Sequence, residues 1–258
     1  MDQKIRIGAV SYLNTKPLLY GIERSRVMNE IELIVDYPAS IADMLLKDEI
    51  DMGLVPVAII PKLSHSFINT DYCIGSDGPV ASVCIFSDKP LETIDTVLLD
   101  YQSRTSVALA KILLKEHWKV TPKLVDAGKD FRDHIHGNTA GVVIGDRALQ
   151  QRKHSPFVYD LGEAWKQFTG LPFVFAGWIS NKPIDPGFIE RFGQANKEGL
   201  LQIPNVVRDN PYPDFDLHAY FTKYLDYSLD DPKRKGLELF LHYLGVNANN
   251  AKKEYFRP

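Results

Sequence analysis

The sequence contains few cysteines and no cysteine pair with the spacing of a metal site. Its 258 residues include two cysteines, Cys73 and Cys84, and neither lies in a Cys-x-x-Cys motif or beside a pair of histidines. This argues against a disulfide framework and against a metal site, so we expect buried free thiols and no bound metal. The seven histidines are scattered over charged or helical segments, where we expect structural or surface roles.

Excess basic charge and long apolar runs are also missing. The net charge of −3 argues against a nucleic-acid partner, because such proteins usually carry a basic face. No apolar run approaches the roughly 20 residues of a membrane helix. A secretory signal, with its basic start and continuous apolar centre, is not visible. We therefore expect a cytoplasmic protein without membrane contact, and the sequence leaves open whether it is a monomer or a homodimer.

Familiar catalytic signatures are absent as well. The chain has no P-loop, GxGxxG, HExxH or GxSxG motif. This removes the common nucleotide-cofactor, zinc-protease and serine-hydrolase classes.

What the chain does contain is a repeated alternation of β-like and helical segments. Apolar, β-favouring runs occur at residues 5–10, 31–37, 51–60, 80–87, 96–100, 119–125, 141–145 and 173–179. Helical spacing follows several of them and dominates after residue 186. The alternation predicts an α/β fold with mostly parallel sheets and helices on both faces.

The chain shows no obvious flexible linker, and two sheets joined by extended crossings would explain this. We place one crossing near residues 86–90 and the return near residues 169–175. The prediction is a discontinuous first lobe of residues 1–87 and 176–258, with a second lobe of residues 88–175. Ligands commonly bind in clefts between such units.

Four polar loops follow predicted strands and form the candidate ligand site. They are residues 11–16 (SYLNTK), 78–82 (GPVAS), 103–106 (SRTS) and 145–147 (GDR). In open α/β sheets, ligands bind at the carboxyl ends of strands. Free N–H groups at a helix start favour anions, and Pro17 indicates a helix start directly after the first loop. The sequence therefore predicts a site for a small anion.

Simpler structural roles remain open for the same residues. Ser103 and Asp146 are good helix N-caps, and Asn14 is a good turn residue. Ser82, on an apolar strand, could donate to a neighbouring carbonyl.

Six motifs, in this order, resemble the chorismate dehydratase family of the futalosine pathway of menaquinone biosynthesis. They are SYLNTKPL (11–18), GLVPVA (53–58), GPVASV (78–83), SRTS (103–106), IGDRAL (144–149) and DLGEAWKQFTGLPFVFAGW (160–178). The resemblance covers essentially the whole chain and is densest between residues 5 and 178. Each motif alone is weak, whereas the ordered set is specific.

The resemblance implies a periplasmic-binding-protein-like (type II) fold, with two α/β lobes around a central cleft. It also implies removal of water from chorismate to give 3-[(1-carboxyvinyl)oxy]benzoate, without a cofactor. The active-site asparagine and serine of that family correspond to Asn14 and Ser82. Relatives often carry a basic residue just before this serine, where the present chain has Ala81.

For such a reaction we expect hydrogen-bond donors around a dianionic substrate. Thr105 and Ser106 are the candidates to hold the ring carboxylate, as an oxyanion hole holds developing charge. The enolpyruvyl carboxylate of the substrate could take the proton, oriented by Asn14, with Asp146 as the rival base. The expected substrate-binding residues are Ser11, Tyr12, Ser103, Arg104, Thr105, Ser106 and Asp146. The candidate ring-packing aromatics are Tyr12, Tyr101, Phe175 and Trp178, and for the last two core packing is the simpler role.

Three other functions stay open at this point. A 1,4-dihydroxy-6-naphthoate synthase of the same pathway shares the fold, but that family typically relies on a histidine base, which the polar loops lack. A non-catalytic solute-binding protein for a carboxylate is compatible with the fold, because fold does not fix function. The effector domain of a transcription regulator is disfavoured, since no helix-turn-helix precedes the first strand.

Overall fold

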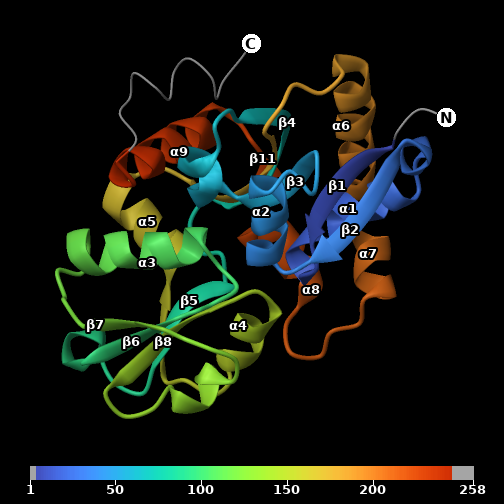
Figure 1. The fold of residues 1–258 in the computed structure, drawn as a ribbon. Helices are drawn as coiled ribbons and strands as arrows, with labels where there is room; N and C mark the ends of the chain where they lie inside the picture. The colour runs from blue at the N-terminus through green and yellow to red at the C-terminus, as the bar shows by residue number, and fades with distance from the viewer. Residues whose placement is uncertain (1–3, 246–258) are drawn as a thin grey trace.

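Two mixed β-sheets organise residues 4–245, which are the residues that the computed structural model describes (Figure 1). The six-stranded sheet has the order β11-β4-β10-β3-β1-β2. Its strands are β1 (Ile5–Val10), β2 (Ile31–Asp36), β3 (Met52–Pro56), β4 (Phe67–Ser76), β10 (Phe173–Ser180) and β11 (Asp226–Ser228). We call this sheet and its helices the first lobe.

The five-stranded sheet forms the second lobe and has the order β7-β6-β8-β5-β9. Its strands are β5 (Val83–Ser87), β6 (Thr96–Leu99), β7 (Lys123–Asp126), β8 (Thr139–Ile144) and β9 (Phe157–Asp160). The chain therefore enters the second lobe once and returns once, so the first lobe is built from both ends of the chain.

Helices pack on both sheets and on each other. They are α1 (Lys16–Glu23), α2 (Pro38–Leu46), α3 (Thr105–Glu116), α4 (Asp146–Gln151), α5 (Leu161–Thr169), α6 (Pro186–Leu200), α7 (Ile203–Asp209), α8 (Leu217–Ala219) and α9 (Asp231–Tyr243). In the first lobe α2 packs on β1 and β3, and α1 packs against α6. In the second lobe α3 and α4 contact β8.

The expectation of mostly parallel sheets is wrong. Strand β1 runs parallel to β2 and β3, and β6 runs parallel to β7 and β8. The strands next to the lobe crossings run the other way: β5 is antiparallel to β8 and β9, and β10 is antiparallel to β3 and β4. A strand that arrives directly from the other lobe needs no crossover helix, so it is free to pair antiparallel.

The strands are not divided between the two sheets at the predicted lobe boundaries, after residues 87 and 175. Strand β5 pairs within the second sheet, so the chain leaves the first sheet after Ser76 and not near residues 86–90. It returns to the first sheet between Thr169 and Phe173. The apolar run of β5 shows that it is buried, but it carries no information about which sheet it joins.

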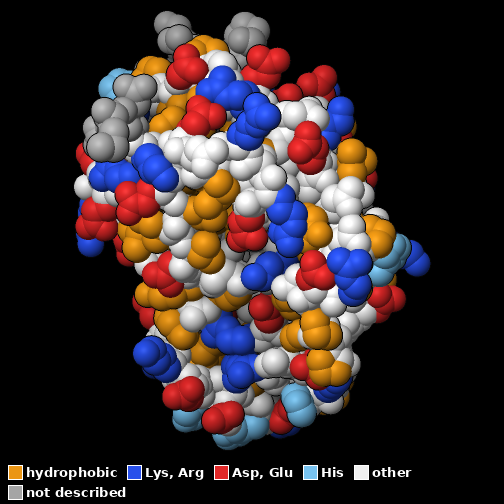
Figure 2. All heavy atoms as spheres, turned by 90° about the vertical axis from the view of Figure 1, so that its right-hand side faces the viewer, with side chains coloured by type: hydrophobic (Ala, Val, Ile, Leu, Met, Phe, Trp, Pro, Cys, Tyr) orange, Lys and Arg blue, Asp and Glu red, His pale blue; other side chains and the backbone are white. Residues whose placement is uncertain are grey.

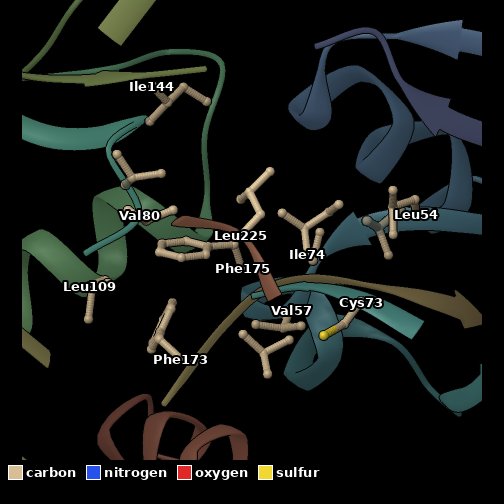
Figure 3. Packing of buried hydrophobic residues seen from close by; sticks show 14 of the residues in the cluster. Leu54, Val57, Cys73, Ile74, Val80, Leu109, Ile144, Phe173, Phe175 and Leu225 are labelled. Atoms are coloured by element: carbon tan, nitrogen blue, oxygen red, sulfur yellow. The ribbon is translucent and has the colours of Figure 1, made fainter. Parts of the chain in front are cut away.

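One continuous hydrophobic core connects the two lobes. Figure 3 shows Leu54 and Ile74 of the first lobe with Val80 and Ile144 of the second, together with Phe175 on β10. The expected free thiols are confirmed: Cys73 and Cys84 are buried and unbridged, and burial raises the pKa of both. The lobes therefore pack on each other through apolar side chains.

The outer surface carries both signs of charge. On the face drawn in Figure 2, Lys and Arg side chains are interspersed with Asp and Glu. Over residues 4–245, the helices are all too short or too polar to cross a lipid bilayer.

Candidate functional site

A cavity lies where the loops of both lobes meet. It holds about 500 Å³ of empty space when the part open to solvent is counted. Its apolar lining is Val10, Pro38, Pro56, Ile74, Val80, Val83, Ile144, Phe175 and Ala176, with Gly145 beside them. Its polar side chains are Tyr12, Asn14, Ser82, Ser103, Thr105 and Ser106.

Six of the nine predicted site residues are thus brought together. Tyr12 and Asn14 follow β1, and Ser82 lies at the crossing into β5. Ser103, Thr105 and Ser106 surround the start of α3, opposite the β1 loop. The ends of β1 and β6 and the crossing thereby present their polar residues to one volume, as expected for the carboxyl ends of sheet strands.

Three hydroxyls in this cavity already accept a hydrogen bond from the protein. Ser82 Oγ accepts from the hydroxyl of Tyr220 at 2.7 Å. Thr105 Oγ1 accepts from the backbone N–H of Ala58 at 3.1 Å, and Ser103 Oγ accepts from the N–H of Ser106 at 3.0 Å. A hydroxyl has one proton to donate, and in each of these bonds that proton is unused. All three are therefore set to donate to a ligand.

The side chain of Asn14 is also positioned to donate to a ligand. Its Oδ1 accepts from the hydroxyl of Thr15 at 3.1 Å, which leaves its NH₂ group as the part available to a ligand. The backbone carbonyl of Asn14 accepts from the buried hydroxyl of Tyr227 at 3.0 Å, so the loop itself is also fixed. Asn14 and the three hydroxyls therefore give the cavity several donors for a ligand.

No charged side chain and no histidine belongs to the lining that the structure describes. Within residues 4–245, no cluster of three His, Cys, Asp or Glu side chains forms a metal-binding group. A positive partial charge comes instead from the backbone, because α3 begins at Thr105 on the cavity. Helix N-termini carry about half a positive charge, so this neutral-looking cavity favours anions.

The other three predicted site residues lie outside the lining. Ser11 is exposed, and its N–H donates to the carbonyl of Asp36. Arg104 forms an ion pair with Asp43 of α2, across the lobe interface. The carboxylate of Asp146 accepts from the N–H of Leu13 at 3.0 Å, and burial raises its pKa. Arg104 and Asp146 therefore join the two lobes.

Of the four predicted ring-packing aromatics, Tyr12 and Phe175 line the cavity. Trp178 is fully buried elsewhere, stacked edge-on against Phe192, so it has the simpler role of core packing. Tyr101 is 37% exposed and is not part of the lining.

The ring of Tyr12, in the first-lobe loop, lies against Gly145 of the second lobe. Its hydroxyl donates to the side chain of Gln102, and Arg147, paired with Asp100, approaches the same oxygen at 3.5 Å. Gly145 has φ = +64°, and a Cβ there would lie 2.7 Å from the Tyr12 ring. Glycine is required here both for the backbone angle and for the approach of the ring.

We expect Gly145→Ala to keep the lobes from closing on each other. The added methyl would clash with the Tyr12 ring and the residue would be strained at positive φ, so ligand affinity should fall by about tenfold or more. Isothermal titration with chorismate, the substrate expected from the sequence, tests this. Gly193→Ala on α6 is the control, since a Cβ there meets nothing within 4 Å. Equal affinity of Gly145→Ala and Gly193→Ala would contradict the expectation.

Asp160 supports the serine from behind, and its position there was missed. It caps α5 by accepting from the N–H groups of Gly162 and Glu163. The same carboxylate also accepts from Val80 (3.0 Å) and Ala81 (2.7 Å) at the crossing. Ala81 has φ = +62°, a conformation that non-glycine residues rarely adopt. A buried carboxylate thus holds the strained turn that presents the next residue to the cavity.

Comparison with known proteins gives the family. The profile of a family described as "Menaquinone biosynthesis" matches residues 5–245. The chain belongs to this menaquinone biosynthesis family. The chain is similar to a chorismate dehydratase of Thermus thermophilus, 28% identical over 273 residues, and the match covers 93% of this chain and 95% of the relative. A chorismate dehydratase of Campylobacter jejuni is 24% identical over 257 residues, covering 97% of this chain and 95% of the relative.

The fold of this menaquinone biosynthesis protein is periplasmic-binding-protein-like, as predicted. A Candida albicans protein described as having the generic periplasmic binding protein fold superposes with a TM-score of 0.64. The two are 13% identical, and the match covers 98% of this chain and 96% of that protein. At this identity the likeness concerns the fold, two α/β lobes with a cavity between them.

Proposed function

We propose that this protein is a chorismate dehydratase, which removes water from chorismate to give 3-[(1-carboxyvinyl)oxy]benzoate. The observation that carries the proposal is the set of hydrogen-bond donors that the cavity lining offers to a ligand. Ser82, Ser103 and Thr105 each accept from the protein and so offer a proton to a ligand, and Asn14 offers its NH₂ group. Chorismate bears two carboxylates, which are acceptors only. The two chorismate dehydratase relatives, similar along nearly their whole length, support the same substrate.

The ring carboxylate fits best at the start of α3. Thr105 and Ser106 lie there, buried, with the positive end of the helix behind them. In the reaction a carbon-bound proton leaves the ring, and negative charge spreads through the diene toward this carboxylate. Preset donors and a helix N-terminus stabilise such charge without rearranging during the reaction. Loss of the neighbouring hydroxyl then makes the ring aromatic, which drives the reaction.

For the proton itself we propose the enolpyruvyl carboxylate of the substrate, held by the Asn14 amide. The lining that the structure describes contains no histidine or carboxylate to act as the base. Asp146, the rival, lies behind the lining and is engaged by the N–H of Leu13. The oxygen or nitrogen of a base must come within about 2.6–3.2 Å of the atom that bears the proton, or act through one water. A carboxylate tethered to the same ring meets this condition.

Chorismate turnover tests the proposal directly. We expect the pure protein, without added metal or cofactor, to consume the diene absorbance of chorismate and to release a product 18 mass units lighter, as the loss of one water requires. Heat-denatured protein is the control for spontaneous decay.

The possible outcomes separate the competing functions. Binding of chorismate without turnover would favour a carboxylate-binding protein, and neither binding nor turnover would overturn the proposed substrate. The naphthoate synthase alternative is less well supported, because the cavity lining described here has no histidine to act as the base.

A further inference from the structure

The hydroxyl of Tyr220 makes one hydrogen bond, and it is to the predicted active-site serine. Tyr220 begins a π-helical turn, Tyr220–Tyr224, which follows α8. Its side chain is 0% exposed, and its ring packs against Phe215 and Phe221. Ser82 Oγ, 2.7 Å away, is the hydroxyl's only partner among residues 4–245. Single π-helical turns occur often at functional sites.

Burial fixes the direction of this hydrogen bond. If Ser82 donated to Tyr220, the phenol proton would have no acceptor among the described residues, which is costly for a fully buried side chain. If Tyr220 donates, its proton is satisfied and the proton of Ser82 is left for the cavity that Ser82 lines. Burial also raises the pKa of Tyr220, so the phenol keeps its proton. The second arrangement leaves no buried polar group unpaired once a ligand is bound.

We propose that Tyr220 is a positioning residue that directs the proton of the Ser82 hydroxyl into the cavity, so that the substrate group at Ser82 is a hydrogen-bond acceptor. The inference rests on the proposed function and adds the direction of one hydrogen bond between the protein and the substrate. On chorismate the group is a carboxylate oxygen or the departing ring hydroxyl accepting through its lone pair. Removing the phenol hydroxyl frees Ser82 to rotate or to donate elsewhere.

A double-mutant cycle tests the coupling. Hydrogen bonds to charged groups are among the stronger ones, so we expect Ser82→Ala to lower kcat/KM for chorismate by about 30-fold. Tyr220→Phe should lower it by about tenfold in the wild-type background. In the Ser82→Ala background Tyr220→Phe should have almost no effect, because the hydroxyl it orients is already gone.

The matched control is Tyr159→Phe. Tyr159 also uses its phenol oxygen in a partly buried hydrogen bond, accepting from the N–H of Leu91 at 2.8 Å, but it is not part of the cavity lining. We expect it to change stability and leave kcat/KM within about twofold of the wild type. Equal effects of Tyr220→Phe in both backgrounds, or no effect in either, would overturn the positioning role.

A measurement without substrate separates this inference from the proposed function. In equal parts of H₂O and D₂O, a slowly exchanging tyrosine hydroxyl gives two signals for its ring carbon Cζ. We expect such a doublet for Tyr220 in selectively labelled protein and its loss in Ser82→Ala, since the hydroxyl then has no acceptor. If chorismate is not a substrate but the doublet behaves in this way, the function is wrong and the hydrogen bond stands. If the doublet is missing in the wild-type protein, the hydrogen bond is wrong.

Discussion

Replacing Asn14 by alanine should lower kcat/KM for chorismate by about 100-fold. The amide is the neutral donor on the first-lobe side of the cavity, with its Oδ1 bound to Thr15 and its backbone carbonyl held by Tyr227. In the proposed mechanism this donor aims the enolpyruvyl carboxylate at the ring proton. A misplacement of about 1 Å at the reacting group is enough for a loss of this size. Steady-state kinetics on folded protein measures it, and near-normal turnover would refute the role of Asn14.

Asp146→Asn is the matched comparison, because it removes the rival base and keeps the structure. The amide Oδ1 can still accept from the N–H of Leu13, which joins the lobes. Burial raises the pKa of Asp146, so the folded protein binds a proton here more tightly than the unfolded chain does. The free energy of unfolding therefore falls as the pH rises through that pKa, because Asp146 then becomes ionised in a buried position. At neutral pH the Asp146→Asn variant should be as stable as the wild type, or slightly more stable. We expect turnover within about threefold of the wild type, whereas the loss of a general base costs about 10²–10⁴-fold.

Most of the polar side chains that line the cavity could be located from the sequence, because they follow strands directly. Tyr12 and Asn14 come just after β1, and Ser103, Thr105 and Ser106 come just after β6, so local sequence locates them at the ends of strands. Arg104 has the same local pattern, yet it pairs with Asp43 instead of lining the cavity. Which way a side chain points at a helix start depends on the partner lobe, and that partner is distant in sequence.

The supporting tyrosines could not be predicted for the same reason. Tyr220 and Ser82 are 138 residues apart in the chain, and Tyr227 and Asn14 are 213 apart. Tyr227 belongs to β11, a three-residue strand that lacks the length for a recognisable alternation pattern. Strand β4, whose first half is only partly buried, was missed too. Apolar runs reveal buried strands, but not short or half-exposed strands at the edge of a sheet.

The largest effect on stability is expected from Asp160→Ala. Its carboxylate accepts from the four backbone N–H groups of Val80, Ala81, Gly162 and Glu163, and it is 7% exposed. Each buried donor left without a partner costs about 1–3 kcal/mol, so the free energy of unfolding should fall by about 4 kcal/mol or more. Urea unfolding measures this loss.

Asp185→Ala is the control for ordinary helix capping. Asp185 caps α6 with a single bond to the N–H of Phe188 at 2.8 Å, so its loss should cost about 1 kcal/mol. A similar cost for the two variants would mean that Asp160 acts as a cap alone and does not hold the crossing.

The milder Asp160→Asn links this stability to the site. The amide keeps one acceptor oxygen but turns an NH₂ group toward backbone donors, so the grip on the 80–81 turn weakens. Ala81, no longer held at φ = +62°, would relax and move Ser82, which lowers kcat in the folded protein. Adding Ala81→Gly removes the cost of the left-handed conformation, about 1–2 kcal/mol for a residue with a Cβ. We therefore expect the double variant to recover most of the lost kcat, and no recovery would show that the carboxylate supports the serine by another route than this turn.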